Sequence, residues 1–260
     1  MKLRREFGCF KVFAFDGDGV LWRGRTPILS GIKVLNELLC LGKTVVLVTN
    51  NSTKSREMYQ ETLRKMGINL PLANIYCSSY GVAVYLSQHG YRSAYVVGED
   101  GLKEELVKAG IKVKRKAEAV VVGMDRKISY SKIATASKLV RDQGAFFIAT
   151  NRDATFPTEK GEYPGAGSIV AAIEVAAKKS VDVNIGKPQP YMFQLIMKDH
   201  NAEPSEIVVI GDRLETDIAA AKRISAKSIL VLTGVAKKED VEKSLEKPDY
   251  ILKDLSELLE

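Results

Sequence analysis

The sequence is poor in cysteine and has no long apolar run. Its three cysteines, Cys9, Cys40 and Cys77, are an odd number without paired close spacing, which argues against a disulfide framework and against a zinc site. No apolar stretch approaches the length that crosses a membrane, and no cleavable apolar segment follows the charged N-terminal residues. We therefore expect free thiols in a reducing compartment, no membrane partner, and a soluble cytoplasmic protein.

Aromatic residues are also few, and positive charge is spread along the chain rather than concentrated. The 39 lysines and arginines exceed the 32 acidic residues, but both signs mix in stretches such as Lys237-Lys238-Glu239-Asp240. The densest basic run, Lys112 to Lys116, has no interleaved aromatic residue on which a base would stack. We therefore expect a solvated charged surface and no nucleic-acid partner.

What the chain does contain is a regular alternation of apolar strands with helical patterns. Lys11 to Phe15 and Val45 to Thr49 are typical of buried strands, and Gly31 to Leu41 has the apolar spacing of a helix. Three further strands are predicted in the middle of the chain, between Ala94 and Ala149. Strand and helix in alternation predict an α/β fold with parallel pairing and right-handed crossovers.

One long segment breaks this alternation. Residues 150 to 167 are predicted to form a loop before an apolar helix at Ser168 to Ala177. A loop of that length inside a compact chain is usually functional.

The first strand ends in two carboxylates and two glycines, Asp16-Gly17-Asp18-Gly19. Asp16 and Asp18 lie two residues apart, which in a regular strand points both side chains to one face. Taken alone, this tetrad is more often a structural turn. It does not fit the calcium-binding loop of an EF-hand, because Val20 and Leu21 follow it.

Polar residues are predicted at the ends of four strands, at Asp16, Thr49, Lys187 and Asp212. Each has an ordinary structural interpretation as a turn, a helix cap or a surface loop. Together they supply what phosphoryl transfer requires: a nucleophilic carboxylate, a second carboxylate for acid and base catalysis, oxygen ligands for Mg²⁺, and a lysine and a hydroxyl for the phosphate oxygens. In an open parallel sheet the four ends would converge.

These motifs resemble, in order, the four signatures of the haloacid dehalogenase (HAD) superfamily. The matching residues are Asp16-Gly17-Asp18-Gly19-Val20-Leu21, Thr49, Lys187, and Gly211-Asp212 with Asp217. Segments 47–52, 165–168, 185–188 and 211–218 further resemble the branch that contains NagD, the 4-nitrophenylphosphatases, phosphoglycolate phosphatase and pyridoxal phosphatase. The resemblance covers nearly the whole chain.

The resemblance implies a Rossmann-like parallel-sheet core with an inserted α/β cap. The catalytic core would comprise residues 1–77 and 182–260, and the cap, residues 78–181, would set substrate specificity. The Asn151-Arg152-Asp153 segment resembles the specificity region of the branch. Arg152 either reaches an anionic leaving group or is a solvated loop arginine, and both interpretations stay open at this stage.

The resemblance also assigns roles in the core. Asp16 would be the nucleophile and Asp18 the general acid and base. Mg²⁺ would be held by the Asp16 side chain, the Asp18 backbone carbonyl and Asp212. Asp217 would either coordinate the ion directly or lie next to its ligands. Thr49, the backbone N–H of Asn50 and Lys187 would bind the phosphoryl group.

The expected function is a Mg²⁺-dependent phosphomonoesterase. It would hydrolyse a small phosphorylated metabolite through an aspartyl-phosphate, with 4-nitrophenyl phosphate as an artificial substrate. The alternatives are a phosphomutase or phosphotransferase of the same superfamily and a non-catalytic phosphoacceptor or sugar-phosphate sensor. Aspartate at position 18 favours hydrolysis, because the family's ATPases lack an acid there. Whether the chain forms a homodimer stays open.

Overall fold

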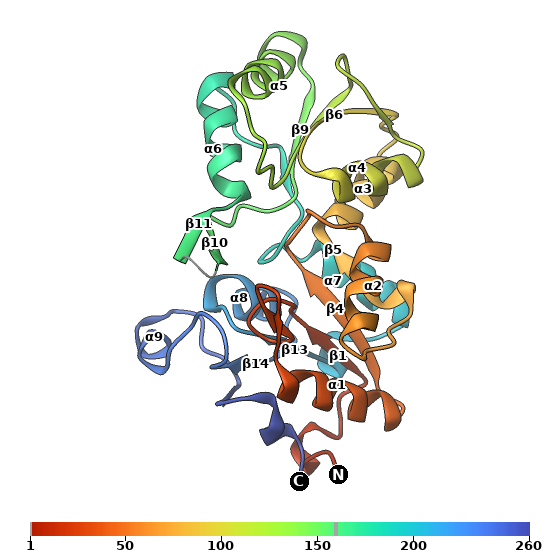
Figure 1. Ribbon diagram of the computed structural model, residues 1–260, viewed down its shortest axis with the longest axis vertical. Helices are drawn as coiled ribbons and strands as arrows, with labels where there is room; N and C mark the ends of the chain where they lie inside the picture. The colour runs from red at the N-terminus through yellow and green to blue at the C-terminus, as the bar shows by residue number, and fades with distance from the viewer. Residues whose placement is uncertain (1, 159–160) are drawn as a thin grey trace. The chain divides into compact units, whose positions relative to one another are not determined.

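The chain folds into two compact units. The computed structural model describes residues 2–158 and 161–260. The first unit comprises Met1–Thr49, Gln60–Tyr76 and Lys187–Glu260, and the second comprises Asn50–Tyr59 and Cys77–Gly186. Each unit is built around its own β-sheet (Figure 1).

The first unit contains a six-stranded sheet with the strand order β15-β14-β13-β1-β4-β5. Its strands are β1 (Val12–Phe15), β4 (Thr44–Thr49), β5 (Ile75–Cys77), β13 (Ile207–Gly211), β14 (Lys227–Val231) and β15 (Tyr250–Leu252). The pairs from β15 to β4 are all parallel. Every residue of β1 and β13 is buried, as expected for strands covered on both faces.

Helices surround this sheet (Figure 1). They are α1 (Leu29–Cys40), α2 (Arg56–Lys65), α7 (Tyr191–His200), α8 (Ala219–Arg223) and α9 (Lys238–Lys243). Residues 60–65 of α2 belong to this unit, whereas residues 56–59 belong to the second. Helix α1 contacts β4, and α8 contacts β14. A small hairpin of β2 (Trp22–Arg23) and β3 (Thr26–Pro27) follows β1. The parallel α/β core predicted from the alternating apolar segments is therefore confirmed.

The second unit contains a five-stranded parallel sheet with the order β12-β9-β8-β6-β7. Its strands are β6 (Ser93–Val97), β7 (Lys112–Val113), β8 (Ala119–Val122), β9 (Phe146–Ala149) and β12 (Val183–Asn184). Its helices are α3 (Ser78–Gln88), α4 (Asp100–Lys108), α5 (Tyr130–Gln143) and α6 (Ala166–Ala177). Helices α5 and α6 pack together over Val120, Val122 and Phe147, and Figure 1 shows α3 and α4 on the other side of the strands.

Two expectations from the sequence are wrong. Residues 150 to 167 are not a continuous loop, because β10 (Thr155–Thr158) and β11 (Gly161–Pro164) pair as an antiparallel hairpin. The rings of Phe156 and Tyr163 meet edge to face across it, with centroids 6.3 Å apart. Each of these strands has only four residues and is flanked by residues typical of turns. The alternation of apolar and polar residues is therefore too short to predict a strand from the sequence.

The second error concerns Lys187. The strand that precedes it in sequence, β12, pairs with β9 in the five-stranded sheet of the second unit. Lys187 therefore does not follow a strand of the sheet that carries Asp16, Thr49 and Asp212, although it belongs to the first unit.

Disulfides and membrane-spanning helices are both absent from the described residues. The three cysteines form no disulfide there, and Cys77 is the buried one. A search of the same residues finds no helix with the length and apolarity that a membrane span requires.

Asp249 directly precedes the edge strand β15, and its carboxylate binds residues of the neighbouring strand β14. Its carboxylate accepts hydrogen bonds from the Nζ atoms of Lys222 and Lys227 and from the backbone and hydroxyl of Ser228, at 2.8 to 3.1 Å. Partial burial raises the pKa of Asp249, but these donors outweigh it and hold the pKa well below its ordinary value.

We expect Asp249→Asn to lower the free energy of unfolding near neutral pH by about 1–2 kcal/mol, because hydrogen bonds to a charged group contribute about 1.5–3 kcal/mol and solvent screening reduces this contribution. The depressed folded-state pKa means that this stabilisation is complete above the unfolded-state pKa of about 4 and is lost as the pH falls below it. The difference in Tm between variant and wild type, measured from about pH 7 to about pH 3, should shrink on acidification.

Asp142→Asn serves as the control, because Asp142 is exposed and pairs with its neighbour Arg141 on the surface of α5. It should leave Tm nearly unchanged. A Tm difference for Asp249→Asn that is absent, or that persists undiminished to low pH, would contradict this account.

Candidate active site

The sheet of the first unit brings three of the predicted site residues to one edge. Asp16 directly follows β1, Asp212 directly follows β13, and Thr49 ends β4. Because β1 pairs in parallel with both β13 and β4, these three positions lie at the carboxyl ends of adjacent strands. Thr49 is almost fully buried, and Asp16 keeps partial exposure.

Lys187 lies at the centre of this edge. Its Nζ donates to Asp16 Oδ1 at 2.6 Å, to Asp217 Oδ1 at 2.6 Å and to the carbonyl oxygen of Val48 at 2.8 Å. The side chains of Lys187 and Asp217 are only 3% and 2% exposed. A buried ammonium group with three acceptors is fully hydrogen-bonded and holds two carboxylates in fixed positions.

The pKa values reflect this crowding of charge. Burial alone would lower the pKa of Lys187, but Asp16 and Asp217 together raise it above its ordinary value. Burial raises the pKa of Asp16 well above the usual range, and Asp217 and Asp212 add to the rise while Lys187 opposes it. Burial, with the neighbouring Asp217, raises the pKa of Asp212 to about 7. The site therefore has an excess of negative charge that a cation would stabilise.

Asp16, Asp212 and Asp217 form a candidate metal site. Each offers a carboxylate oxygen, and these oxygens lie within 4.8 Å of one another. Hard oxygen donors at this density suit Mg²⁺, whose charge would oppose the rise in the aspartate pKa values. The Asp18 side chain is not part of this cluster, so a role for Asp18 as a ligand rests on its backbone carbonyl.

Glycines allow the chain to approach Asp212 closely. Gly19 has a φ of +80°, and a Cβ there would lie 2.2 Å from Asp212 Oδ2. A Cβ on Gly234 would come within 1.9 Å of the same oxygen. Asp212 Oδ2 also accepts the backbone N–H of Val235 at 2.8 Å. The carboxylate of Asp212 is thereby fixed by main chain on both sides.

Sequence reasoning missed this contribution of residues 233–235. Thr233 Oγ1 donates to the carbonyl of Gly19 at 2.6 Å, which joins the segment after β14 to the turn after β1. Arg23 also donates to the carbonyl of Thr233. In the sequence, Thr233 and Gly234 directly follow a buried strand, which marks a possible functional position. Their residue types do not indicate that Thr233 contacts Gly19, which is distant in the sequence.

The turn that carries Asp18 is tightly hydrogen-bonded. The carbonyl of Gly17 accepts the N–H groups of Leu21 and Trp22 at 2.9 and 3.1 Å, and Gly19 donates to the carbonyl of Trp22 at 2.7 Å. The Trp22 indole fills the space beside Gly17, where a Cβ would lie 2.2 Å from the ring. Asp18 is partly exposed at this turn, so its side chain is accessible to solvent.

The second unit contains the other predicted residues, and it brings three of them together. Asn50 Nδ2 donates to both carboxylate oxygens of Asp153, at 3.0 and 3.2 Å. Asn151 Nδ2 donates to the Asn50 carbonyl at 2.7 Å, and Asn151 Oδ1 accepts the N–H of Asp153 at 3.1 Å. The hydroxyl of Ser78 also donates to the Asn50 carbonyl.

Arg152 does not join this group. Its two terminal nitrogens donate to the two carboxylate oxygens of Glu174, each at 2.8 Å. This paired geometry is the strong form of an arginine–carboxylate contact, although the arginine is exposed. A substrate carboxylate that bound Arg152 would have to displace Glu174.

Comparisons with known proteins identify the family to which the chain belongs. A family model described as haloacid dehalogenase-like hydrolase matches residues 13–112, and a second model of HAD-like hydrolases matches residues 184–258. The chain is 36% identical to phosphoglycolate phosphatase 2 of Arabidopsis thaliana over 282 residues, which cover 97% of this chain and 93% of the relative.

Solved structures show the same likeness along the whole chain. The p-nitrophenyl phosphatase from Archaeoglobus fulgidus has a TM-score of 0.90 at 34% identity, covering 95% of this chain and 97% of that one. NagD from E. coli K-12 has a TM-score of 0.87 at 30% identity, covering 95% and 98%. The chain therefore belongs to the haloacid dehalogenase-like hydrolases and, within them, to the NagD-like branch of phosphatases.

Proposed function

We propose that this phosphatase hydrolyses a small phosphorylated metabolite in two steps, with Mg²⁺ as cofactor and Asp16 as the nucleophile. The observation that carries the proposal is the convergence of Asp16, Asp212 and Asp217 around the Lys187 ammonium group. This arrangement holds a carboxylate ready to attack phosphorus beside groups that offset negative charge. The free thiols fit a reducing, cytoplasmic setting, which forms part of the proposal.

In the first step, an Asp16 oxygen attacks the phosphorus and the bond to the leaving-group oxygen breaks. Lys187 keeps the Asp16 carboxylate oriented and offsets charge on the phosphoryl oxygens, with the hydroxyl of Thr49 and the N–H of Asn50 as further donors. Asp18 gives its proton to the departing alkoxide. In the second step, Asp18 removes a proton from water, which attacks the phosphorus and releases Asp16 and inorganic phosphate.

Mg²⁺ would be held by Asp16, the Asp18 backbone carbonyl and Asp212, and Asp217 supports the same group of carboxylates. When bound, the ion would screen the repulsion between the anionic nucleophile and the anionic phosphate. The fit rests on the buried carboxylate cluster, in which one lysine does not balance three acids.

The second unit is proposed to restrict the substrate through residues Asn151 to Asp153. Asp153 and Asn151 are fixed by Asn50, which directly follows Thr49 in the chain. Because Glu174 binds the Arg152 guanidinium group, we assign selectivity to Asn151 and Asp153 before Arg152. The physiological substrate is proposed only as a phosphate monoester of a small metabolite, the class to which phosphoglycolate belongs.

A phosphotransferase or phosphomutase is the second candidate, because it would use the same aspartyl-phosphate. It would pass the phosphoryl group to an acceptor hydroxyl instead of water. A phosphoacceptor or sensor without turnover is less well supported, since Asp18 is accessible and its residue type suits the activation of water.

Replacing the nucleophile tests the proposal first. We expect Asp16→Asn to lower kcat for 4-nitrophenyl phosphate by at least about a thousandfold, because an amide cannot form the acyl-phosphate. Circular dichroism should show that the variant is folded, and Asp142→Asn should keep full activity. Substantial turnover by folded Asp16→Asn would refute the proposed role.

Asp18→Asn tests the acid and base role separately. The loss of activity should be larger for an alkyl phosphate such as glycerol phosphate than for 4-nitrophenyl phosphate, whose leaving group does not need a proton. Slow attack by water should also let the phosphorylated protein accumulate, which intact-protein mass spectrometry detects. Equal losses on both substrates, with no phosphorylated protein, would count against this role.

Metal removal provides a third test. Chelation should abolish activity, and added Mg²⁺ should restore it and raise Tm, because binding to the folded state stabilises it. Asp212→Asn should raise by about tenfold or more the Mg²⁺ concentration that gives half of the full activation and half of the full rise in Tm. The proposal fails if chelated protein stays fully active or if Asp212→Asn responds to Mg²⁺ like the wild type.

A further inference from the structure

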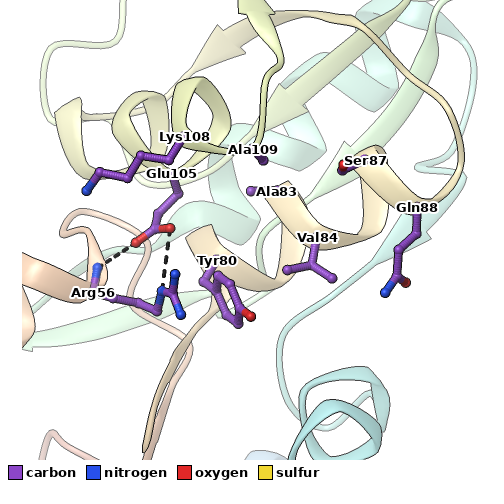
Figure 2. A pocket seen from close by; sticks show the side chains of 9 residues that line it. All are labelled: Arg56, Tyr80, Ala83, Val84, Ser87, Gln88, Glu105, Lys108 and Ala109. Carbon is purple, nitrogen blue, oxygen red and sulfur yellow. Dashed lines mark hydrogen bonds and ion pairs between the residues drawn. The ribbon is translucent and has the colours of Figure 1, made fainter. Parts of the chain in front are cut away.

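A pocket lies wholly within the second unit, between helices α3 and α4 (Figure 2). Its volume is about 270 Å³, close to the lower end of the range for small-molecule sites, which is about 300–1,000 Å³. Ala83 and Val84 from α3 and Ala109 after α4 give it an apolar wall, and Ser87 and Gln88 line its exposed end. The proposed catalytic chemistry uses none of these residues.

Arg56, the first residue of α2, closes one end of the pocket (Figure 2). Its guanidinium carbon lies 3.7 Å from the centroid of the Tyr80 ring, a cation–π contact that holds the group flat. The Nε atom is buried but has no hydrogen-bond acceptor within the described part of the chain. The nearest carboxylate oxygen, Glu105 Oε2, is 3.7 Å away, beyond hydrogen-bond distance.

Glu105 is therefore an incomplete partner for Arg56. Its carboxylate is 2% exposed, and Oε1 accepts the backbone N–H of Arg56 at 2.6 Å rather than a guanidinium N–H. Burial raises the pKa of Glu105, and the nearby Arg56 opposes that rise only in part. A planar guanidinium group that stacks on an aromatic ring and has an Nε without an acceptor among the described residues is suited to bind a further oxyanion.

The surrounding charges favour a monoanion. Lys108 Nζ, at the rim, is bound by Glu57 at 2.5 Å and lies 4.0 Å from Glu104. With Glu105 and Glu57 close by, a phosphate dianion would meet more repulsion than a carboxylate would. The two oxygens of a carboxylate also match the donor geometry of the guanidinium group.

We propose that this pocket binds a small organic carboxylate, with its two oxygens on the Arg56 guanidinium group and a short apolar body along Ala83, Val84 and Ala109. The site is separate from the proposed catalytic residues, and its occupation does not require phosphatase activity.

Pentanoate is the probe that tests the proposal. Isothermal titration calorimetry and amide chemical shifts should show saturable binding at one site, with the largest shifts in α3 and α4. 1-Pentanol, which has the apolar body without the charge, and inorganic phosphate, which has charge without that body, should each bind at least about tenfold more weakly.

Variants locate the site. Arg56→Gln should weaken pentanoate binding by about tenfold or more, because a charge-assisted hydrogen bond is lost. Ser87→Trp should weaken it by filling the open end, without altering Arg56. Arg115→Gln, a matched change at an exposed arginine of the same unit, should leave binding unchanged. Asp16→Asn should also leave it unchanged, which separates this result from the proposed catalytic function.

The proposal is overturned if pentanol or phosphate binds as tightly as pentanoate at these residues. It is equally overturned if both Arg56→Gln and Ser87→Trp bind pentanoate like the wild type. Loss of binding in Asp16→Asn would assign the carboxylate to the catalytic residues instead. The thermal stability of each variant, measured in parallel, shows whether weakened binding reflects unfolding.

Discussion

The candidate active site depends on the hydrogen bonds and ion pairs of the Lys187 ammonium group. Asp217 is buried and Asp16 is only slightly exposed, and these two acids from distant parts of the chain are held close together because Lys187 donates to both. Removing one partner from such a buried group of charges typically costs about 3–5 kcal/mol. The third donor contact, to the Val48 carbonyl, ties the same group to β4 beside Thr49. Lys187 thus joins chain segments that are more than a hundred residues apart.

The sheet and the glycines make this arrangement attainable. Parallel pairing of β4, β1 and β13 brings Thr49, Asp16 and Asp212 to one edge, as the sequence predicts from three buried apolar runs that each end in a polar residue. Gly19 and Gly234 then let main chain lie against the Asp212 carboxylate. Burial and the neighbouring acids raise the pKa values of Asp16 and Asp212, and a cation bound among these carboxylates would oppose that rise.

The local sequence pattern predicts most strands and helices and the family, but it does not predict every strand pairing or side-chain contact. Buried strands are visible as continuous apolar runs, and the Asp-Gly-Asp-Gly turn follows one directly. The β10–β11 hairpin is not recognisable from the sequence because its strands are short. The sheet that contains β12, the strand before Lys187, is not recognisable either, because parallel strands pair with partners distant in the sequence. The same limit applies to Thr233 with Gly19 and to Glu174 with Arg152, which meet only through the fold. Residue type shows that a side chain can donate or accept, but topology determines with which group.

The central claim, that hydrolysis passes through a phosphorylated Asp16, is tested most directly by the stereochemistry at phosphorus. A phosphorothioate monoester made chiral at phosphorus with two oxygen isotopes would be hydrolysed in the presence of Mg²⁺ in water that carries the third isotope. The inorganic thiophosphate released is then itself chiral, so its configuration can be compared with that of the substrate. Each in-line displacement inverts the configuration. Two successive displacements, first by Asp16 and then by the acceptor, predict net retention, whereas net inversion would show a single direct attack and contradict the account.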